Sequence, residues 1–239
     1  MLNRASAPAG RPVAFVAAAL FALLLPAFVS AQSDEDPVTI EDQYLSSRVT
    51  VGTLEAQLRT DNEELKLLAL DSMESQFESG TLPRDNETAF EALAYVLDEG
   101  VVHVTKGDNL PLHYFPDVRR RAAEVISYST HEGVVPQLLT NVLHDPEATV
   151  RAEALYSLGR IGADPEWSVS KTIAKRLLRE DLGEPDPGVV YAALVAFENI
   201  YADPDNEPHG AAREMVMRVS VGPYNQLIRR KAMTILGTM

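Results

Sequence analysis

The sequence predicts an all-α protein built from repeated pairs of helices. Three observations support this prediction. A spaced apolar pattern recurs five times, helix-starting residues stand before the clearest copies, and the intervals leave room for a second helix. The pattern places its key residues at offsets of 0, 4, 7 and 8, which fall on one face of a helix, so each copy should bury a stripe. Hydrophobic residues make up 46% of the 239 residues, enough for a real core.

The five copies share an aliphatic residue, a basic residue or its substitute, an alanine, and two further apolar or small positions. They begin at Leu65, Val118, Val150, Val189 and Ile228. The small alanine, Ala154 in the third copy, would let a neighbouring helix approach closely. Asp145-Pro146 and Asp186-Pro187 predict helix starts, because Asp can cap a helix and Pro fits its first turn.

The last four copies begin 32, 39 and 39 residues apart, which suits two helices and two turns per unit. We expect second helices over residues 87–98, 134–143, 167–180 and about 211–220. Asp85 or Asn86 should cap the first of them. The 53 residues from Leu65 to Val118 exceed one unit, and residues 101–116, with a glycine and two prolines, are interpreted as an inserted loop.

The third copy carries the most specific pattern. From Asp145 to Gly162 it is Asp-Pro-x-x-x-Val-Arg-x-x-Ala-x-x-x-Leu-Gly-x-Ile-Gly, which resembles a HEAT or HEAT-like repeat. The resemblance implies an α-solenoid of about five helix pairs, wound as a right-handed superhelix, with first helices on its convex side and second helices on its concave side. Two copies depart from the pattern, with Lys66 and Val190 in place of the arginine.

The arginines at the second position of the pattern, Arg119, Arg151 and Arg229, are expected to be structural. In the repeats that they resemble, such arginines pair with acidic residues of the adjacent unit and hold the stack together. The last predicted helix, residues 227–236, has no second helix after it. Either this helix serves as its own cap, or its open side receives a partner or a second copy of the protein.

The first 31 residues have the features of a secretory signal peptide. Two arginines precede an apolar run over residues 13–25, and small residues ending at Ala31 follow a proline. We expect cleavage there and a periplasmic or secreted bacterial protein. The alternative is an uncleaved anchor, since residues 12–29 approach the ~20 residues of a membrane helix. Only in that case is contact with a membrane expected.

The predicted domains follow from these boundaries. Residues 1–31 form the signal peptide, residues 32–53 an N-terminal segment, and residues 54–239 the HEAT-like repeat domain. The net charge is −14, and without the signal, which holds two arginines and no acidic residue, it is −16. A surface of this charge disfavours nucleic acid as a partner.

The sequence offers no clear catalytic or metal site. It has no cysteine, and its five histidines share no metal-ligand spacing on one helix. It also lacks a Gly-rich phosphate loop, a His-Glu-x-x-His motif and a Gly-x-Ser-x-Gly motif. Asp203 to Glu207 resembles a calcium loop superficially, but Pro208 stands where such a loop needs glycine, which favours a simple turn. We therefore expect no catalytic residue, no metal and no cofactor.

One helix carries a candidate binding site. Lys171, Lys175 and Arg179 recur at every fourth position of the predicted helix over residues 167–180, and we call these three residues the basic strip. They should share one face, opposite Ile173, Leu177 and Leu178. With Trp167 at its edge, and Arg213 or Arg218 of the next unit extending it, the strip could dock an acidic peptide or helix of a partner protein. The alternative is a solvated face that balances neighbouring acids.

Three functions remain compatible with these features. The leading interpretation is an exported, non-enzymatic scaffold or adaptor that binds proteins in the bacterial envelope. A lyase-like enzyme subunit is a second, because HEAT-like repeats also occur in proteins resembling the phycobilisome lyases. An inhibitor or chaperone of a secreted protein is a third.

Overall fold

A computed structural model describes residues 50–99 and 114–239, which lie within one compact unit of the chain, residues 40–239. Residues 50–58 are helical, and the described ranges contain helices and turns but no strand. The prediction of an all-α fold is confirmed.

Two sequence predictions concern other parts of the chain. The signal peptide and most of the N-terminal segment lie outside the described residues, as does nearly all of the predicted loop over residues 101–116. Among the helices that can be described, none combines the length and the apolar character needed to span a membrane.

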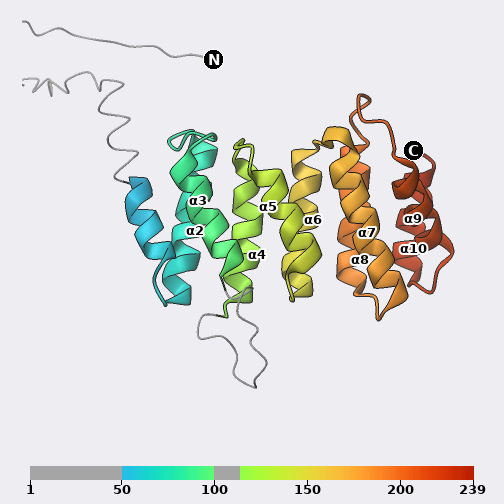
Figure 1. Cartoon of the computed structure of the whole chain (residues 1–239), viewed down its shortest axis with the longest axis horizontal. Coiled ribbons are helices and arrows are strands. Elements are labelled where there is room, and N and C mark those ends of the chain that lie inside the picture. Colours follow the sequence, from blue (N-terminus) through green and yellow to red (C-terminus); the bar gives the residue numbers. More distant parts are fainter. Residues whose placement is uncertain (1–49, 100–113) are drawn as a thin grey trace, which may run out of the picture. The chain divides into compact units, whose positions relative to one another are not determined.

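The helices form two layers along a row (Figure 1). The first layer holds α2 (Glu63–Ser79), α4 (Pro116–Val125), α6 (Ala148–Ile161), α8 (Pro187–Ile200) and α10 (Gln226–Leu236). The second layer holds α3 (Glu87–Asp98), α5 (Val134–His144), α7 (Ser168–Leu182) and α9 (Gly210–Val221). Each of these helices begins and ends within about three residues of the position that the repeat pattern predicts, except that α2 extends farther.

Contacts between the helices are those of an α-solenoid. Within each layer every helix packs against the next one along the row, most extensively α6 against α8. Each second-layer helix also packs against the first helix of the following unit, as α5 does against α6 and α9 against α10. No unit is self-contained, and the core runs continuously through the stack.

The helices α6 and α8 approach each other closely at Gly159. A Cβ atom built there would lie 2.8 Å from the Cα atom of Ala196 in α8, so the two helices meet almost backbone to backbone. Ser157, two residues earlier and buried, donates to the carbonyl oxygen of Ala123 in α4 at 2.6 Å. Small residues at the predicted positions thus fix how tightly the first layer packs.

Helix caps agree with the sequence prediction at some starts. Asp186 accepts hydrogen bonds from the amides of Gly188 and Val189 at 2.8 and 3.1 Å, and Pro187 lies in the first turn of α8. Asn86 caps α3 in the same way. These side chains satisfy amides that have no partner inside the helix.

The prediction that Asp145 and Pro146 start the next helix is wrong. Helix α6 begins at Ala148, after both residues, and no side chain caps it at Glu147. The Asp145 carboxylate accepts from the amide of Glu147 at 2.8 Å and also binds Arg119 from the preceding unit. Because this buried arginine needs a counterion, the aspartate serves the stack and not the cap.

A buried ion pair connects consecutive units at Arg119, as predicted, whereas Arg151 pairs within its own unit. The Nε atom of Arg119 lies 3.0 Å from Oδ2 of Asp145, and the two side chains are 1% and 0% exposed. Arg151 lies 3.8 Å from Glu180, near the end of α7. Glu180 belongs to the second helix of the same unit as Arg151, so the prediction of a partner in the adjacent unit is wrong for this arginine. We call these pairs the ladder.

The ladder begins with a lysine and is incomplete at its end. Lys66, which replaces arginine in the first copy, pairs with Glu99. Arg229 in α10 is exposed and pairs with no acidic residue in the described ranges, so the structural role predicted for it is not realised there. No described unit stacks beyond α10, and none supplies the acid.

Candidate functional site

The candidate site begins at the turn that leads into α7. Glu166 and Trp167 have positive φ angles of 53° and 58° in the 3₁₀ turn Pro165–Trp167. The Asp164 carboxylate caps α7 from this turn by accepting from the amides of Val169 and Ser170 at 2.9 and 3.1 Å. The strained turn therefore fixes where the helix starts and where the tryptophan lies.

The basic strip lies on the exposed face of α7. Lys171, Lys175 and Arg179 are all exposed, and none of them forms an ion pair with a described acidic residue. Their polar contacts are with backbone oxygens. Lys171 donates to Glu166 at 3.2 Å and Arg179 to Leu143 at 3.5 Å, which leaves the positive charges without a counterion.

The fourth cation of α7, Arg176, differs from the basic strip because it forms an ion pair. Arg176 is half-buried and pairs with Glu180, four residues on, which also receives Arg151 of the ladder. Burial and the nearby Arg176 charge lower the pKa of Arg151. The Glu180 carboxylate thus pairs with two guanidinium groups. The three cations of the basic strip have no described carboxylate partner.

The two arginines expected to extend the strip are engaged elsewhere. Arg218 in α9 binds Asp181 at 2.6 Å, and its hydrogen bond lowers the pKa of that carboxyl. The Tyr224 hydroxyl also donates to Asp181 at 3.1 Å, and burial together with this contact raises the pKa of Tyr224 to about 12. Arg213 donates to the carbonyl oxygen of Met239. The charge of Arg218 is therefore neutralised within the protein.

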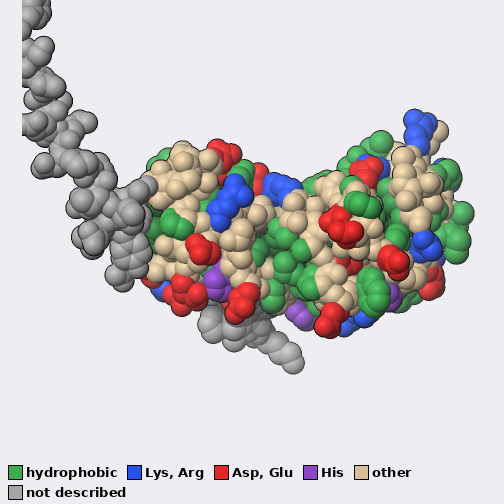
Figure 2. Space-filling model, turned by 90° about the horizontal axis from the view of Figure 1, so that it is seen from above, with side chains coloured by type: hydrophobic (Ala, Val, Ile, Leu, Met, Phe, Trp, Pro, Cys, Tyr) green, Lys and Arg blue, Asp and Glu red, His purple; other side chains and the backbone are tan. Residues whose placement is uncertain are grey.

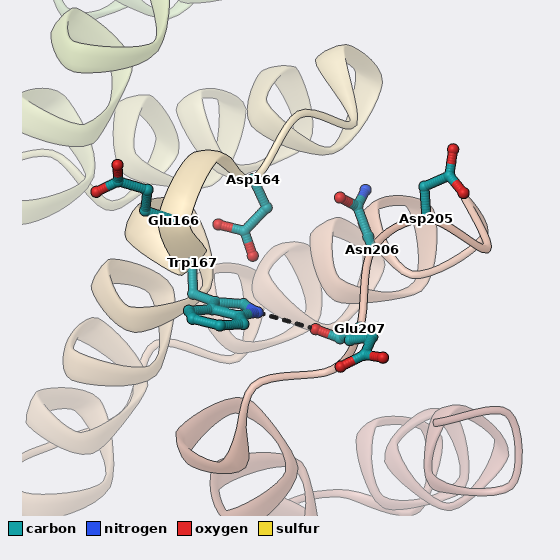
Figure 3. Close-up of a pocket in the computed structure, with 6 residues that line it drawn as sticks. All are labelled: Asp164, Glu166, Trp167, Asp205, Asn206 and Glu207. Carbon is teal, nitrogen blue, oxygen red and sulfur yellow. Dashed lines mark hydrogen bonds between the residues drawn. The ribbon is translucent and has the colours of Figure 1, made fainter.

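Trp167 lines an acidic cleft (Figure 3) and also contacts Lys171 of the strip. The residue is 44% exposed, its ring centroid lies 5.5 Å from the Lys171 ammonium, and its indole nitrogen donates to the Glu207 carbonyl at 3.2 Å. The cleft has a volume of about 440 Å³ and is lined by Trp167 and five polar residues. These are Asp164, Glu166, Asp205, Asn206 and Glu207.

The polar groups of this cleft are tied to the fold. Asp164 caps α7, and Asn206 donates to the carbonyl oxygens of Gly162 and Ile200 at 2.9 and 2.8 Å. Asp203 accepts from the amide of Asp205 at 3.0 Å, which is the turn hydrogen bond expected of an aspartate. No group of three or more potential ligands among the described residues could hold a metal ion, and the turn interpretation of this segment fits these bonds.

The prediction that Leu178 lies opposite the basic strip is wrong. The side chain is 38% exposed, and Leu182, one turn on, is 76% exposed. Position 178 follows Lys171 by seven residues and Lys175 by three, so helical geometry places it on their face. That spacing was the sequence signal for an apolar continuation of the strip. Ile173 and Leu177 are buried, as predicted.

With this geometry established, the family comparison decides the type of repeat. Residues 112–198 match the family model of HEAT repeats. The protein carries HEAT repeats. The matched region spans α4 to α8 and includes the whole of α7, so the basic strip lies on a helix of a HEAT repeat. Helices α2, α3, α9 and α10 continue the same two layers on either side of the match.

A comparison with curated proteins finds no match. HEAT repeats commonly form helical scaffolds for protein interactions.

Proposed function

We propose that this HEAT-repeat protein is an exported, non-enzymatic scaffold of the bacterial envelope that binds an acidic segment of a partner protein through α7. The proposal rests on the exposure of the basic strip and on its lack of described counterions. In an acidic protein with a net charge of −14, three adjacent positive charges lie exposed on one face without a counterion among the described acids.

The distribution of the other cations supports this assignment. The ladder residues and several surface residues, such as Arg121 with Asp71 and Glu74, are paired with acids of the chain. Arg84, Arg229 and Arg230 are also exposed without a described ion pair, so what distinguishes the strip is the placement of three such cations on one helix face. Cations left without partners attract an acidic ligand, and they speed its encounter more than they increase its final affinity.

A charge-reversal comparison tests the proposed binding site. The full chain with a C-terminal tag is expressed in its native host as wild type and as K171E/K175E/R179E, and captured partners are quantified by mass spectrometry. A matched control, R84E/R229E/R230E, reverses three exposed cations elsewhere and changes the net charge equally. We expect at least a tenfold loss of one specific partner with the first variant and none with the second. Equal capture by both variants would contradict the proposal.

Export has its own test. Fractionation of cells that express the full chain with a C-terminal tag should place the protein in the periplasm or the medium, and N-terminal sequencing should begin at Gln32. Full-length protein in the membrane fraction would show that the signal is an anchor. Protein in the cytoplasm would contradict the proposed location.

A further inference from the structure

The outer face of α7 continues beyond the basic strip with apolar side chains. Leu178 follows Lys175 by three residues, and Leu182 follows Leu178 by four. This spacing keeps both leucines on the side of the helix that carries Lys171 and Lys175. The two leucines are 38% and 76% exposed. Within about 16 Å of helix, at a rise of 1.5 Å per residue, the surface changes from cationic to apolar.

The neighbouring helix adds to this apolar region. In α9, Met217 is 56% exposed and Val221 is 78% exposed, and they flank Arg218 in the sequence. Arg218 in turn binds Asp181, the residue before Leu182, so this ion pair holds the two helices together at the point where the apolar side chains emerge. We call Leu178, Leu182, Met217 and Val221 the apolar patch.

Large apolar side chains are exposed on several helices, and four of them belong to the apolar patch. Figure 2 shows hydrophobic side chains at the surface where the row ends with α9 and α10. Of the large apolar side chains that are exposed in the described ranges, Val221 and Leu182 are the most exposed. Exposed apolar side chains on two packed helices, beside charges without a described counterion, are typical of a binding site.

We propose that the basic strip and the apolar patch together bind an amphipathic helix of a partner protein. The bound face of this helix would carry carboxylates at one end, over Lys171 and Lys175, and aliphatic side chains at the other, over the apolar patch. This inference rests on the proposed function and specifies the partner of the same site.

The chemistry of the face supports a helical ligand. Two adjacent helices with outward apolar side chains present a surface into which an apolar helix face can pack, with anchors at spacings of three and four residues. The described part of the site has no strand edge that could pair with an extended peptide. The distance from Lys171 to Leu182 corresponds to about three helical turns, which sets the minimum length of the ligand.

Charge complementarity favours this ligand over an anionic membrane. The face also carries Glu214 and the neutralised Arg218–Asp181 pair, and the acidic cleft beside Trp167 adjoins its other end. A lipid surface would meet these acids together with the cations, whereas a helix can place its carboxylates over the strip alone.

The experiment uses a synthetic probe and the mature protein. A fluorescein-labelled 14-residue peptide carries glutamates at positions 1 and 5 and leucines at positions 8 and 12 of an alanine-rich helix. A control peptide has the same composition in an order that places glutamates and leucines on opposite faces. Fluorescence anisotropy should show at least tenfold tighter binding of the patterned peptide to the wild-type protein.

Two variants separate this inference from the proposed function. L182S/V221S should weaken binding of the patterned peptide at least tenfold, while the matched variant L68S/M233S, at leucine and methionine side chains 61% and 58% exposed on other helices, should not. All four positions are on the surface, and circular dichroism melts check that each variant folds.

The outcomes are distinct. If L182S/V221S binds the patterned peptide as the wild type does, or if the two peptides bind equally, the inference of an amphipathic helix fails while an acidic partner remains possible. If K171E/K175E/R179E also binds the patterned peptide unchanged, the proposed function fails with it. Binding of the wild type to vesicles of anionic phospholipid that is lost in L182S/V221S would identify a membrane surface and overturn the inference, as would the absence of any peptide binding.

Discussion

The ladder and the basic strip contain the same types of cation in opposite surroundings. Arg119 is buried against Asp145, whereas Lys175 lies exposed without an acidic partner among the described residues. A buried charge has lost its water, so removing its counterion strongly destabilises the fold. An exposed charge is solvated, so removing a neighbouring charge changes the stability little. The difference teaches that position in the repeat decides what a cation does: the inner ones hold the units together and the outer ones are available to a partner.

The largest expected effect is at the ladder. Asp145→Asn leaves the Arg119 guanidinium buried without a counterion, and we expect it to lower the free energy of unfolding by about 3–5 kcal/mol. Urea unfolding followed by circular dichroism measures this change. A loss below about 1 kcal/mol would mean that the ladder does not hold the stack.

A second, smaller effect tests the close contact between α6 and α8 in the first layer. Gly159→Val would force a side chain into the backbone of α8 at Ala196, and overpacking of this kind costs about 1–3 kcal/mol of unfolding free energy. Gly210→Ala is the control, since a Cβ atom there meets nothing within 4 Å. Equal stability of both variants would contradict the close contact between α6 and α8.

A smaller effect is expected at Asp181, which joins α7 to α9. The Arg218 hydrogen bond lowers the pKa of this carboxyl, so its contribution to stability is present above its ordinary pKa of 3.8 and is lost as pH falls through the lowered value. Asp181→Asn should therefore be less stable than the wild type at pH 7, and the two should converge in strong acid. Urea unfolding across this pH range measures the difference, and a gap that stays constant would show that the ion pair contributes nothing.

The smallest effect on stability is expected at the strip itself. Replacing Lys171, Lys175 and Arg179 by glutamine should change the free energy of unfolding by no more than about 0.5 kcal/mol, because exposed positions without specific partners tolerate substitution. The same urea experiment measures it. A loss comparable to that of Asp145→Asn would place the strip among the structural cations and remove its distinction from the ladder.

Much of the fold could be predicted from the sequence because each helix carries its own apolar period. Position 0 of the later copies, from Val118 to Ile228, is buried, as the offsets required, but Leu65 of the first copy is 39% exposed, which the prediction had wrong. The roles of individual polar residues were harder to predict. Asp145 looks like a cap in the sequence, and only the neighbouring unit, 26 residues away, makes it the counterion of Arg119.

The candidate site was predictable where it depends on one helix and not where it depends on two. The spacing of Lys171, Lys175 and Arg179 within α7 was sufficient to place them on one face. The pairing of Arg218 with Asp181 depends on how α9 packs against α7, and no local pattern encodes that contact. The exposure of Leu178 was available from its spacing to Lys171 and was assigned to the wrong face.

Site-specific photo-crosslinking in the native host tests the central claim most directly. A photoreactive amino acid replaces Lys175 on the outer face of α7, Arg84 on a loop of another unit, or Leu68 on α2, each in the otherwise unchanged full-length protein. If the strip is the binding surface, one specific partner should crosslink from position 175 and none from positions 84 and 68. The product from position 175 should be lost when Lys171 and Arg179 are both changed to glutamate. The same product from all three positions, or no product from position 175 alongside one from position 68, would contradict the claim that α7 is where this protein meets its partner.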